Sequence, residues 1–513
     1  MEYTLKKEKC RICETDFEGA SEQPVDIELS LPDYCPDIER ILKCRICPGI
    51  TSGVITGDRL DVDGNVTVRL YYLDSKKQAV RLCEHTRPFS CSFTLKSAQP
   101  DRFCRVRLRT EYLNCRAVSP RKLDIHGAFS VLAKVCRAEE KQYCTSIDGS
   151  DIEQQCHSEK ISTLKGCANQ QFTLSEVLDI GKGKGSPEMI LRSELNYIPD
   201  DSRAIENKLM LKGEAVLKVL YITDIESGSQ DTMSFNIPVS QIIDVPGIDE
   251  GTVNDISVDV MSYDISLKSE FDEGSTLLNL DARLCACVRA FEDREIVIID
   301  DAYSTEYELE TGYRTESFMR LASLCDMTQS ITGNINTDGS GITRVIDLWC
   351  ESISSIADND SGKISIRGKM NLCMLALDSE GVPFCTDKTV DFSFVPDEAD
   401  SDCKPSVRTD LCVSGISFRI TDDNNVEFKV DLRLSGAVYE SRSVRCINDA
   451  SANEEKRREK DKTAALTIYY ADKNESLWDI ARRYCTSVEA VRLENSLTDD
   501  IIQARSMVLI PMQ

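Results

Sequence analysis

Two short cysteine motifs have the clearest capacity for chemistry in this chain. The pentapeptide Lys-Cys-Arg-Ile-Cys occurs at residues 9–13 and again at 43–47. Four thiolates can close a tetrahedral zinc site. The ligands in that hypothesis are Cys10, Cys13, Cys44 and Cys47. The distribution of the 23 cysteines favours the other interpretation, because most lie along predicted strands, where a thiol is a small buried apolar group.

Other combinations of reactive residues predict no catalytic site. The three histidines, His85, His126 and His157, have no neighbouring sequence typical of an activated nucleophile. The glycine-lysine run at 181–186 departs from a phosphate-binding loop, because Gly185 separates Lys184 from the serine. Among 87 acidic residues no single pair stands out. We therefore expect a binding protein, without a cofactor, and not an enzyme.

The composition restricts the partners and the compartment. A net charge of -26 repels phosphate backbones, and an aromatic content of 6% offers few stacking surfaces, so nucleic acid is not an expected partner. No stretch approaches eighteen apolar residues, and the first residues lack the apolar core of a secretory signal. These features predict a cytoplasmic protein with no membrane span and with reduced thiols.

The residues from 466 onward predict a compact module with the order strand, helix, helix, strand. Short β-branched and aromatic runs at 466–470 and 507–510 predict the two strands. Ser476 is placed as an N-cap, and an apolar face at helical spacing follows it. That face consists of Leu477, Ile480, Ala481 and Tyr484. A second apolar stretch, 488–495, predicts the second helix, with Asn495 at its end.

This module resembles a LysM domain, a type that binds and does not catalyse. The resemblance is carried by Leu466-Thr-Ile-Tyr-Tyr470, Asn474-Glu-Ser-Leu-Trp-Asp-Ile-Ala481, Val488-Glu-Ala-Val-Arg-Leu-Glu-Asn495 and Val508-Leu-Ile-Pro511. The residues expected to hold its structure together are Leu477, Trp478, Ile480, Asn495, Ile510 and Pro511.

The same module departs from the LysM pattern at the two loops that border the glycan groove. Glycine-containing turns are usual there, and this chain has Asn474-Glu475 and Ala504-Arg505-Ser506 instead. A long side chain at Arg505 stands where backbone would otherwise approach a sugar closely. We therefore predict a protein-binding rim, with peptidoglycan as the alternative ligand. The predicted rim consists of Asn474, Glu475, Ser476, Ala504, Arg505 and Ser506.

A short pattern recurs three times in the rest of the chain. It starts at Gly64, Gly213 and Gly368, and every second residue after the glycine is apolar, as in a half-buried strand. These apolar positions are Val66, Val68, Leu70, Ala215, Leu217, Val219, Met370, Leu372 and Met374. Each copy is followed by a long alternating pair that predicts a hairpin. The pairs are 105–116 with 123–135, 256–267 with 277–288, and 407–420 with 426–438.

These features predict a mainly β protein with three tandem β-sandwich-like domains and a small βααβ LysM domain. The stretch after the first unit is polar and glycine-containing, and a charged run precedes the module, so we predict linkers at both places. The predicted order is an N-terminal segment (1–23), a first β domain (24–140), a linker (141–170), a second β domain (171–292), a connecting segment (293–325), a third β domain (326–448), a charged linker (449–465) and the LysM domain (466–513).

Three such β units followed by a LysM domain resemble the SipL-like spore-envelope morphogenesis proteins of clostridia, which have tandem SPOCS domains and a C-terminal LysM domain. The resemblance covers the chain from about Pro24 to Pro511. It implies a scaffold or adaptor in the mother-cell cytoplasm at the forespore surface. It also implies that the LysM domain docks the morphogenetic ATPase of the spore-coat basement layer.

Overall fold

The structure is a computed structural model of the full chain. It describes residues 2–76, 79–96, 98–180, 185–269, 276–337, 339, 341–360, 363–396, 403–458 and 466–511. Most of the glycine-lysine run, most of the connection within the hairpin predicted from 256–267 and 277–288, and the end of the charged linker lie outside these residues.

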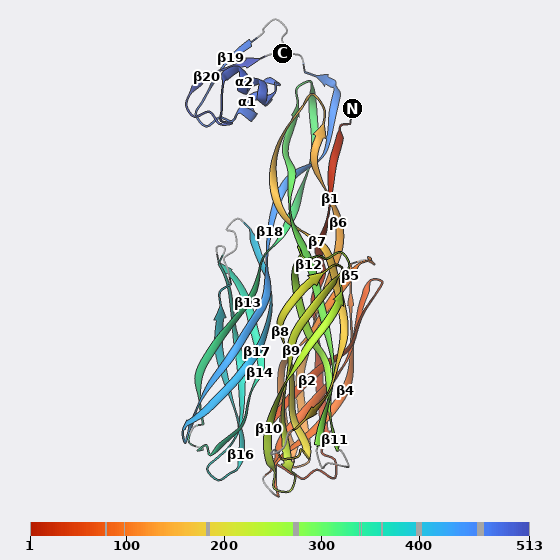
Figure 1. The fold of residues 1–513 in the computed structure, drawn as a ribbon, viewed down its shortest axis with the longest axis vertical. Helices are drawn as coiled ribbons and strands as arrows, with labels where there is room; N and C mark the ends of the chain where they lie inside the picture. The colour runs from red at the N-terminus through yellow and green to blue at the C-terminus, as the bar shows by residue number, and fades with distance from the viewer. Residues whose placement is uncertain are drawn as a thin grey trace.

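The first unit is a sandwich of two three-stranded antiparallel sheets (Figure 1). One sheet has the order β1 (Thr4–Ser30), β6 (Lys122–Asp148), β5 (Arg102–Ser119). The other has the order β2 (Ile38–Thr56), β3 (Arg59–Asp74), β4 (Val80–Thr94). The apolar faces of the two sheets enclose one core, as sheet-on-sheet packing requires.

Units two and three repeat this strand order. In unit two the sheets are β7 (Ile152–Asp179), β12 (Thr276–Ser304), β11 (Val253–Ser269) and β8 (Met189–Ile205), β9 (Lys208–Asp224), β10 (Ser229–Asp244). In unit three they are β13 (Tyr307–Asn336), β18 (Asn425–Arg457), β17 (Lys404–Asp422) and β14 (Arg344–Asp360), β15 (Lys363–Leu377), β16 (Pro383–Phe394). Each unit has its own buried core. The prediction of three β-sandwich-like domains is confirmed.

The repeated glycine lies in the central strand of the smaller sheet in every unit, on β3, β9 and β15. The apolar residues that alternate after it are buried in each core. A Cβ on Gly64 would meet the Phe89 ring at 2.5 Å, and one on Gly368 would meet the Phe392 ring at 2.3 Å. In unit two the ring of Tyr197 closes over Gly213 in the same way. Glycine is therefore required because an aromatic ring occupies the space of its side chain.

The longest strand pair of each unit continues beyond its sandwich as a two-stranded ribbon. Three ribbons result, β1 with β6, β7 with β12, and β13 with β18, and together they form a stalk that leads to the C-terminal module (Figure 1). The stalk interior is built from buried residues of all three units. Successive sets along it are Cys136, Phe291 and Tyr439, then Tyr143, Ile298 and Cys446, then Ile147, Ala302 and Ala450.

The stalk corrects three of the predicted connections. Residues 152–170 belong to β7, 293–304 and 307–325 belong to β12 and β13, and 449–457 belong to β18, so these stretches are strands and not linkers. Only 149–151 and 305–306 remain as turns between units, both at the stalk tip. A ribbon buries one narrow side against two others and exposes the rest, so its composition is polar. The polar composition of these stretches therefore did not distinguish linkers from stalk strands.

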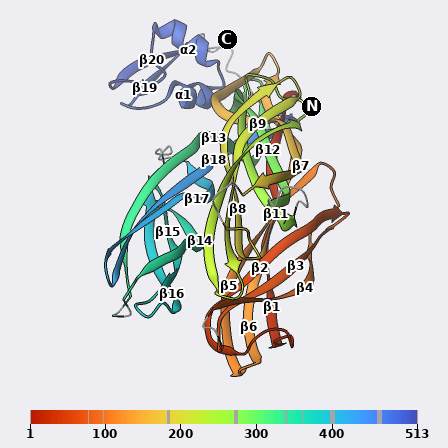
Figure 2. The same ribbon diagram turned by 60° about the horizontal axis from the view of Figure 1, so that its bottom comes forward.

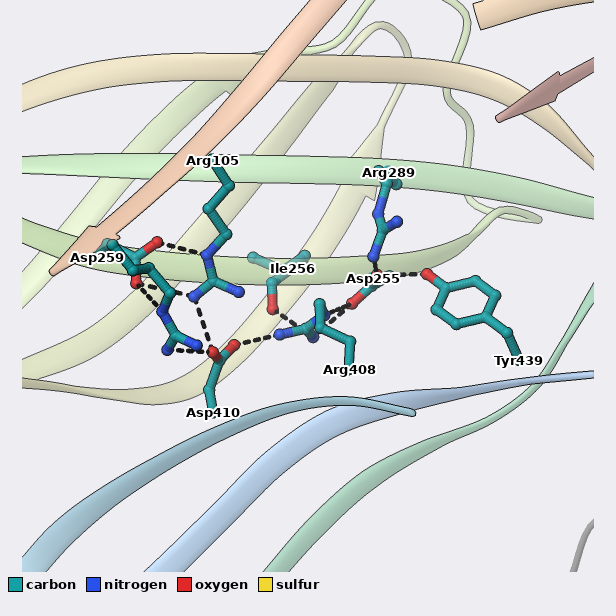
Figure 3. Close-up of polar contacts among 9 residues, drawn as sticks. Arg105, Asp255, Ile256, Asp259, Arg289, Arg408, Asp410 and Tyr439 are labelled. Atoms are coloured by element: carbon teal, nitrogen blue, oxygen red, sulfur yellow. Dashed lines mark hydrogen bonds and ion pairs between the residues drawn. The ribbon is translucent and has the colours of Figure 1, made fainter. Parts of the chain in front are cut away.

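A buried charge network joins the three sandwiches at the base of the stalk (Figure 3). Asp255 on β11 is 2% exposed and accepts hydrogen bonds from Arg289, Arg408 and Tyr439. Arg105 of unit one donates to Asp259 of unit two at 2.6 Å and to Asp410 of unit three at 2.8 Å. Each carboxylate thus faces at least two cationic or hydroxyl donors, the condition under which buried charges are tolerated.

The smaller sheets meet in a second junction of buried residues from all three units. Tyr71 on β3 donates a hydrogen bond to the carbonyl of Leu191 on β8 at 3.1 Å. The guanidinium of Arg192 lies 4.7 Å from the Trp349 ring centre and pairs with Asp347 at 3.1 Å. The two junctions hold the sandwiches together as one body.

We predict that Asp255→Ala destabilises the chain by about 3–5 kcal/mol, because it removes a buried carboxylate that two partly buried arginines and Tyr439 share. Urea denaturation measures this change. The matched control is Glu427→Ala, which breaks an exposed pair with Arg419 and should change stability by less than about 1 kcal/mol. Equal effects of the two substitutions would contradict the assignment of Asp255 as the centre of the junction.

The same network predicts a loss of stability in acid. Burial alone would raise the pKa of Asp410, but Arg105, Arg107 and Arg408 outweigh it and lower that pKa to about 2. A carboxylate whose folded pKa lies below its unfolded value, about 3.9, contributes stability above that pH and loses it as the pH falls toward 2. Denaturation midpoints should therefore drop between about pH 5 and pH 2, and Asp410→Asn should flatten that dependence. The same pH dependence of the midpoint in Asp410→Asn as in the unchanged chain would contradict this role of Asp410.

Candidate functional site

The C-terminal module folds as the strand and cap patterns predict. Its elements are β19 (Leu466–Ala471), α1 (Leu477–Tyr484), α2 (Val488–Asn495) and β20 (Ser506–Pro511), and β19 pairs with β20. The side-chain oxygen of Ser476 accepts a hydrogen bond from the Trp478 amide and begins α1. Leu477, Ile480 and Ile510, predicted as structural, are fully buried in the module core.

Asn495 ties the second helix to the last strand. Its side-chain amide donates to the carbonyl of Leu509 at 2.7 Å and accepts from the Leu509 amide at 2.6 Å. It also donates to the Val491 carbonyl at 2.8 Å. A side chain that satisfies both backbone groups of one strand residue acts as a neighbouring strand would. Asn495 therefore joins α2 to β20 through three hydrogen bonds. Pro511 is half-buried at the end of that strand.

The two rim loops lie side by side and are joined by backbone hydrogen bonds. The Asn474 amide donates to the Ile502 carbonyl at 2.8 Å, and the Ile502 amide donates to the Glu475 carbonyl at 2.9 Å. Asn474 has φ of 69°, in the left-handed region. Asparagine tolerates that conformation better than most residues. The loop therefore keeps a glycine-like backbone although the glycine is absent.

The six predicted rim residues differ in what their side chains do. Glu475 points into the module, where it accepts from the Tyr469 hydroxyl at 2.7 Å and the Asp472 amide at 3.1 Å. Ser476 is used by the helix cap. The exposed members are Asn474, Ala504, Arg505 and Ser506. Arg505 lies 3.5 Å from Asp472 in a solvent-exposed ion pair. The accessible rim is thus polar and charged.

An apolar face adjoins this rim and was not predicted. Ile468, Tyr470 and Met507 on the outer side of the β19–β20 sheet are 56%, 66% and 52% exposed. The alternation of 466–470 could have indicated this face. Helices cover only one side of the two-stranded sheet, so every second side chain points to the other, open side. Exposed apolar side chains clustered beside a polar rim are typical of protein-binding surfaces.

Trp478 packs against the module core and also contacts the stalk. Its indole is half-buried and lies at the edge of the module, where the ring centre is 4.9 Å from that of Tyr303 at the stalk tip. Its Nε1–H donates to Asp301 at 3.1 Å. The contact with the stalk, which no local pattern could predict, decides the position of this side chain. Figure 2 shows the module seated at that end of the molecule.

The four cysteines of the zinc hypothesis are distributed over two parts of the structure. Cys10 and Cys13 lie on β1 in the stalk, whereas Cys44 and Cys47 lie on β2 in the first sandwich. The thiol of Cys13 neighbours that of Cys136, and Cys44 neighbours Cys115. Residues three apart on a strand point to opposite faces, so the motif cannot chelate as it does in a turn. Within the described ranges, no group of three or more His, Cys, Asp and Glu side chains is placed to hold a metal.

Two of the three histidines lie between carboxylates. His157 contacts Asp300 at 2.6 Å and Glu159 at 3.0 Å. His126 contacts Asp26 at 2.8 Å, and this carboxylate raises its pKa. Both histidines thus contact acidic side chains, with no nucleophile among these contacts.

Comparison with known proteins agrees with the arrangement of domains. The family model described as SipL, SPOCS domain, matches residues 37–118 and 187–268, and the LysM domain model matches residues 469–511. The chain has a SipL-like architecture. Its matched SPOCS segments run from β2 into β5 and from β8 into β11, so the stalk strands lie outside them. No curated protein and no solved structure matches the chain.

These matches define the general character of the chain. SPOCS and LysM domains are binding and scaffold types without catalytic function, and they fit a sporulation-related protein with the capacity to bind peptidoglycan. Among the helices in the described residues, none is long and apolar enough to cross a membrane.

We predict that Asn495→Ala destabilises the LysM domain by about 1–3 kcal/mol, because the backbone groups of Leu509 lose their hydrogen-bond partner. Hydrogen exchange at the Leu509 amide measures the effect, and exchange there should accelerate. Glu494→Ala, at an exposed neighbouring position, is the control and should leave that exchange unchanged. Equal protection in both variants would show that Asn495 does not secure β20.

Proposed function

We propose that this chain is a non-enzymatic scaffold of spore coat or envelope assembly, whose LysM domain docks the morphogenetic ATPase of the coat basement layer. In this proposal the protein works in the mother-cell cytoplasm, at the forespore surface. The observation that carries it is the combination of SPOCS domains with a LysM domain whose rim is polar and has no glycine in the loop segments 474–476 and 504–506.

The rim supports a protein partner over a glycan. Arg505 and Asp472 form an exposed pair of opposite charges, which suits electrostatic recognition of another protein surface. The adjoining Ile468, Tyr470 and Met507 offer the apolar area that such recognition also needs. The aromatic side chain of Trp478, a candidate for stacking on a sugar, is engaged with Tyr303 instead.

We further propose that the third unit is a SPOCS domain like the two matched ones. Its strand order is the same as theirs. Gly368 on β15 meets the Phe392 ring as Gly64 on β3 meets that of Phe89. In this proposal the three units are the supporting body and the LysM domain supplies the main contact with the ATPase.

Binding of peptidoglycan is the second candidate. One observation favours it, because Asn474 preserves the left-handed backbone that the glycine of a sugar-binding loop would adopt. The backbone at this one position is thus open to the same close approach as a glycine would permit. Asn474 in place of the usual glycine is therefore compatible with a protein partner and with peptidoglycan.

The rim variant Arg505→Glu tests the first proposal. We expect it to weaken retention of the coat ATPase about tenfold, the change that about 1.4 kcal/mol of lost affinity produces. Arg419→Glu, an equally exposed charge reversal in unit three, is the control and should leave binding unchanged. Binding of the purified full chain to immobilised ATPase measures both. Unchanged binding of the Arg505→Glu chain would contradict docking through the rim.

Sedimentation with purified peptidoglycan distinguishes the second candidate. Strong co-sedimentation of the full chain, lost on Arg505→Glu, together with no measurable ATPase binding, would replace the scaffold proposal by the glycan one. Absence of co-sedimentation with ATPase binding intact supports the scaffold.

A further inference from the structure

The three ribbons of the stalk end in equivalent positions that carry different residues. Ile147, Ala302 and Ala450 are buried together near the tip, one from each unit. One residue further along the strands are Asp148, Tyr303 and Ser451. One residue earlier are Ser146, Asp301 and Asp449. At these two positions, β12 is therefore the one strand of the three that carries both an aromatic ring and a carboxylate.

That combination is where the LysM domain sits. Tyr303 is 2% exposed and is counted among the buried residues of the LysM core. Its hydroxyl donates to the carbonyl of Thr486 at 2.7 Å, and its ring meets that of Trp478 edge-to-face. Asp301 accepts from the Trp478 indole at 3.1 Å and pairs with Arg482. The contacts span both ends of α1.

The partner strand of the same ribbon adds a contact with the start of the second helix. The Val488 amide at the first residue of α2 lies 3.4 Å from a carboxylate oxygen of Glu153 on β7. A carboxylate is favoured there because the first amides of a helix are unsatisfied and carry partial positive charge. Burial raises the pKa of Glu153. The tip thus presents two carboxylates and one aromatic ring to a module face that carries Arg482, Trp478 and a helix start.

We propose that the tip of the β7–β12 ribbon is an intramolecular docking site for the α1 face of the LysM domain, which withholds Trp478 from outside partners. In the docked state, the rim around Arg505 and the face around Tyr470 are the surfaces left for a partner. Release from the tip exposes the indole and adds a third surface. Tyr303 and Asp301 determine which of the three equivalent ribbon ends the domain occupies.

The composition of the contact makes docking reversible. It consists of one aromatic pair, a few hydrogen bonds and an ion pair in which Arg482 is 47% exposed. Salt screens ion pairs of this exposure, and domain interfaces of this polar kind permit relative motion. Raised ionic strength should therefore favour the released state. This inference concerns the chain alone and does not depend on the identity of the LysM partner.

Tryptophan fluorescence of the full chain tests the proposal. The chain has two tryptophans, and Trp349 is 4% exposed, so changes in acrylamide quenching report on Trp478. We expect Tyr303→Ala with Asp301→Ala to raise the quenching constant about twofold or more and to shift emission to the red, because the indole loses its apolar and hydrogen-bonding partners. High salt should likewise raise the quenching constant of the unchanged chain and shift its emission to the red.

The equivalent position on another ribbon provides the matched control. Asp449→Ala removes the carboxylate that corresponds to Asp301 on the β13–β18 ribbon and should leave quenching unchanged. Hydrogen exchange at the Val488 amide should accelerate in the double variant, while stalk strands β6 and β13 keep their protection. If Tyr303→Ala lowers the hydrogen-exchange protection of the stalk strands, the single variant Asp301→Asn replaces the double variant. It should also raise acrylamide quenching of Trp478.

Two results would overturn the proposal. One is a Trp478 in the unchanged chain that is already as accessible as in the double variant. The other is an equal effect of Asp449→Ala. Neither measurement includes the ATPase or peptidoglycan, so failure here leaves the proposed function untouched, and loss of ATPase binding on Arg505→Glu leaves the docking proposal untouched.

Discussion

The charge network around Asp255, Asp259 and Asp410 is the interaction on which the arrangement of the three sandwiches depends, because Arg105 of unit one binds the last two carboxylates. Asp255 is nearly inaccessible to solvent and accepts from two arginines and a tyrosine that come from units two and three. Tyr439, one of those donors, also belongs to the lowest buried set of the stalk, so one acid connects the sandwiches to the ribbons. Removal of Asp255 takes a carboxylate from two partly buried arginines, whereas loss of a surface pair leaves charges that water solvates.

Local patterns were sufficient for the parts of the fold that local forces determine. Alternation after Gly64, Gly213 and Gly368 identified the central strands, and Ser476 identified the start of α1, because both depend on near neighbours in sequence. The stalk was missed because its ribbons expose most of their residues and so have the composition of linkers. The stalk contacts of Trp478 were missed because its partners, Asp301 and Tyr303, lie far away in sequence. The apolar face of β19 was present in the alternation but needed the knowledge that no helix covers it.

Repetition and asymmetry are combined in this chain. The sandwiches share one strand order, yet the ring that closes over the repeated glycine comes from the fourth strand in units one and three, and from the second strand in unit two. The ribbons share their buried positions, yet one of them alone ends in Tyr303. Differences between copies at otherwise equivalent positions are where a repeat protein acquires distinct tasks, since the shared positions are already committed to packing.

The stalk also determines where the chain can act. Because the ribbons run together from the sandwiches to the LysM domain, the binding end and the hairpin ends of the sandwiches lie at opposite extremes of the long axis (Figure 1). A strand ladder resists bending far better than a coil of the same length, since every residue is hydrogen-bonded to a neighbour. The ribbons therefore fix the separation between the stalk tip and the hairpin ends of the sandwiches, whether or not the LysM domain is docked on that tip.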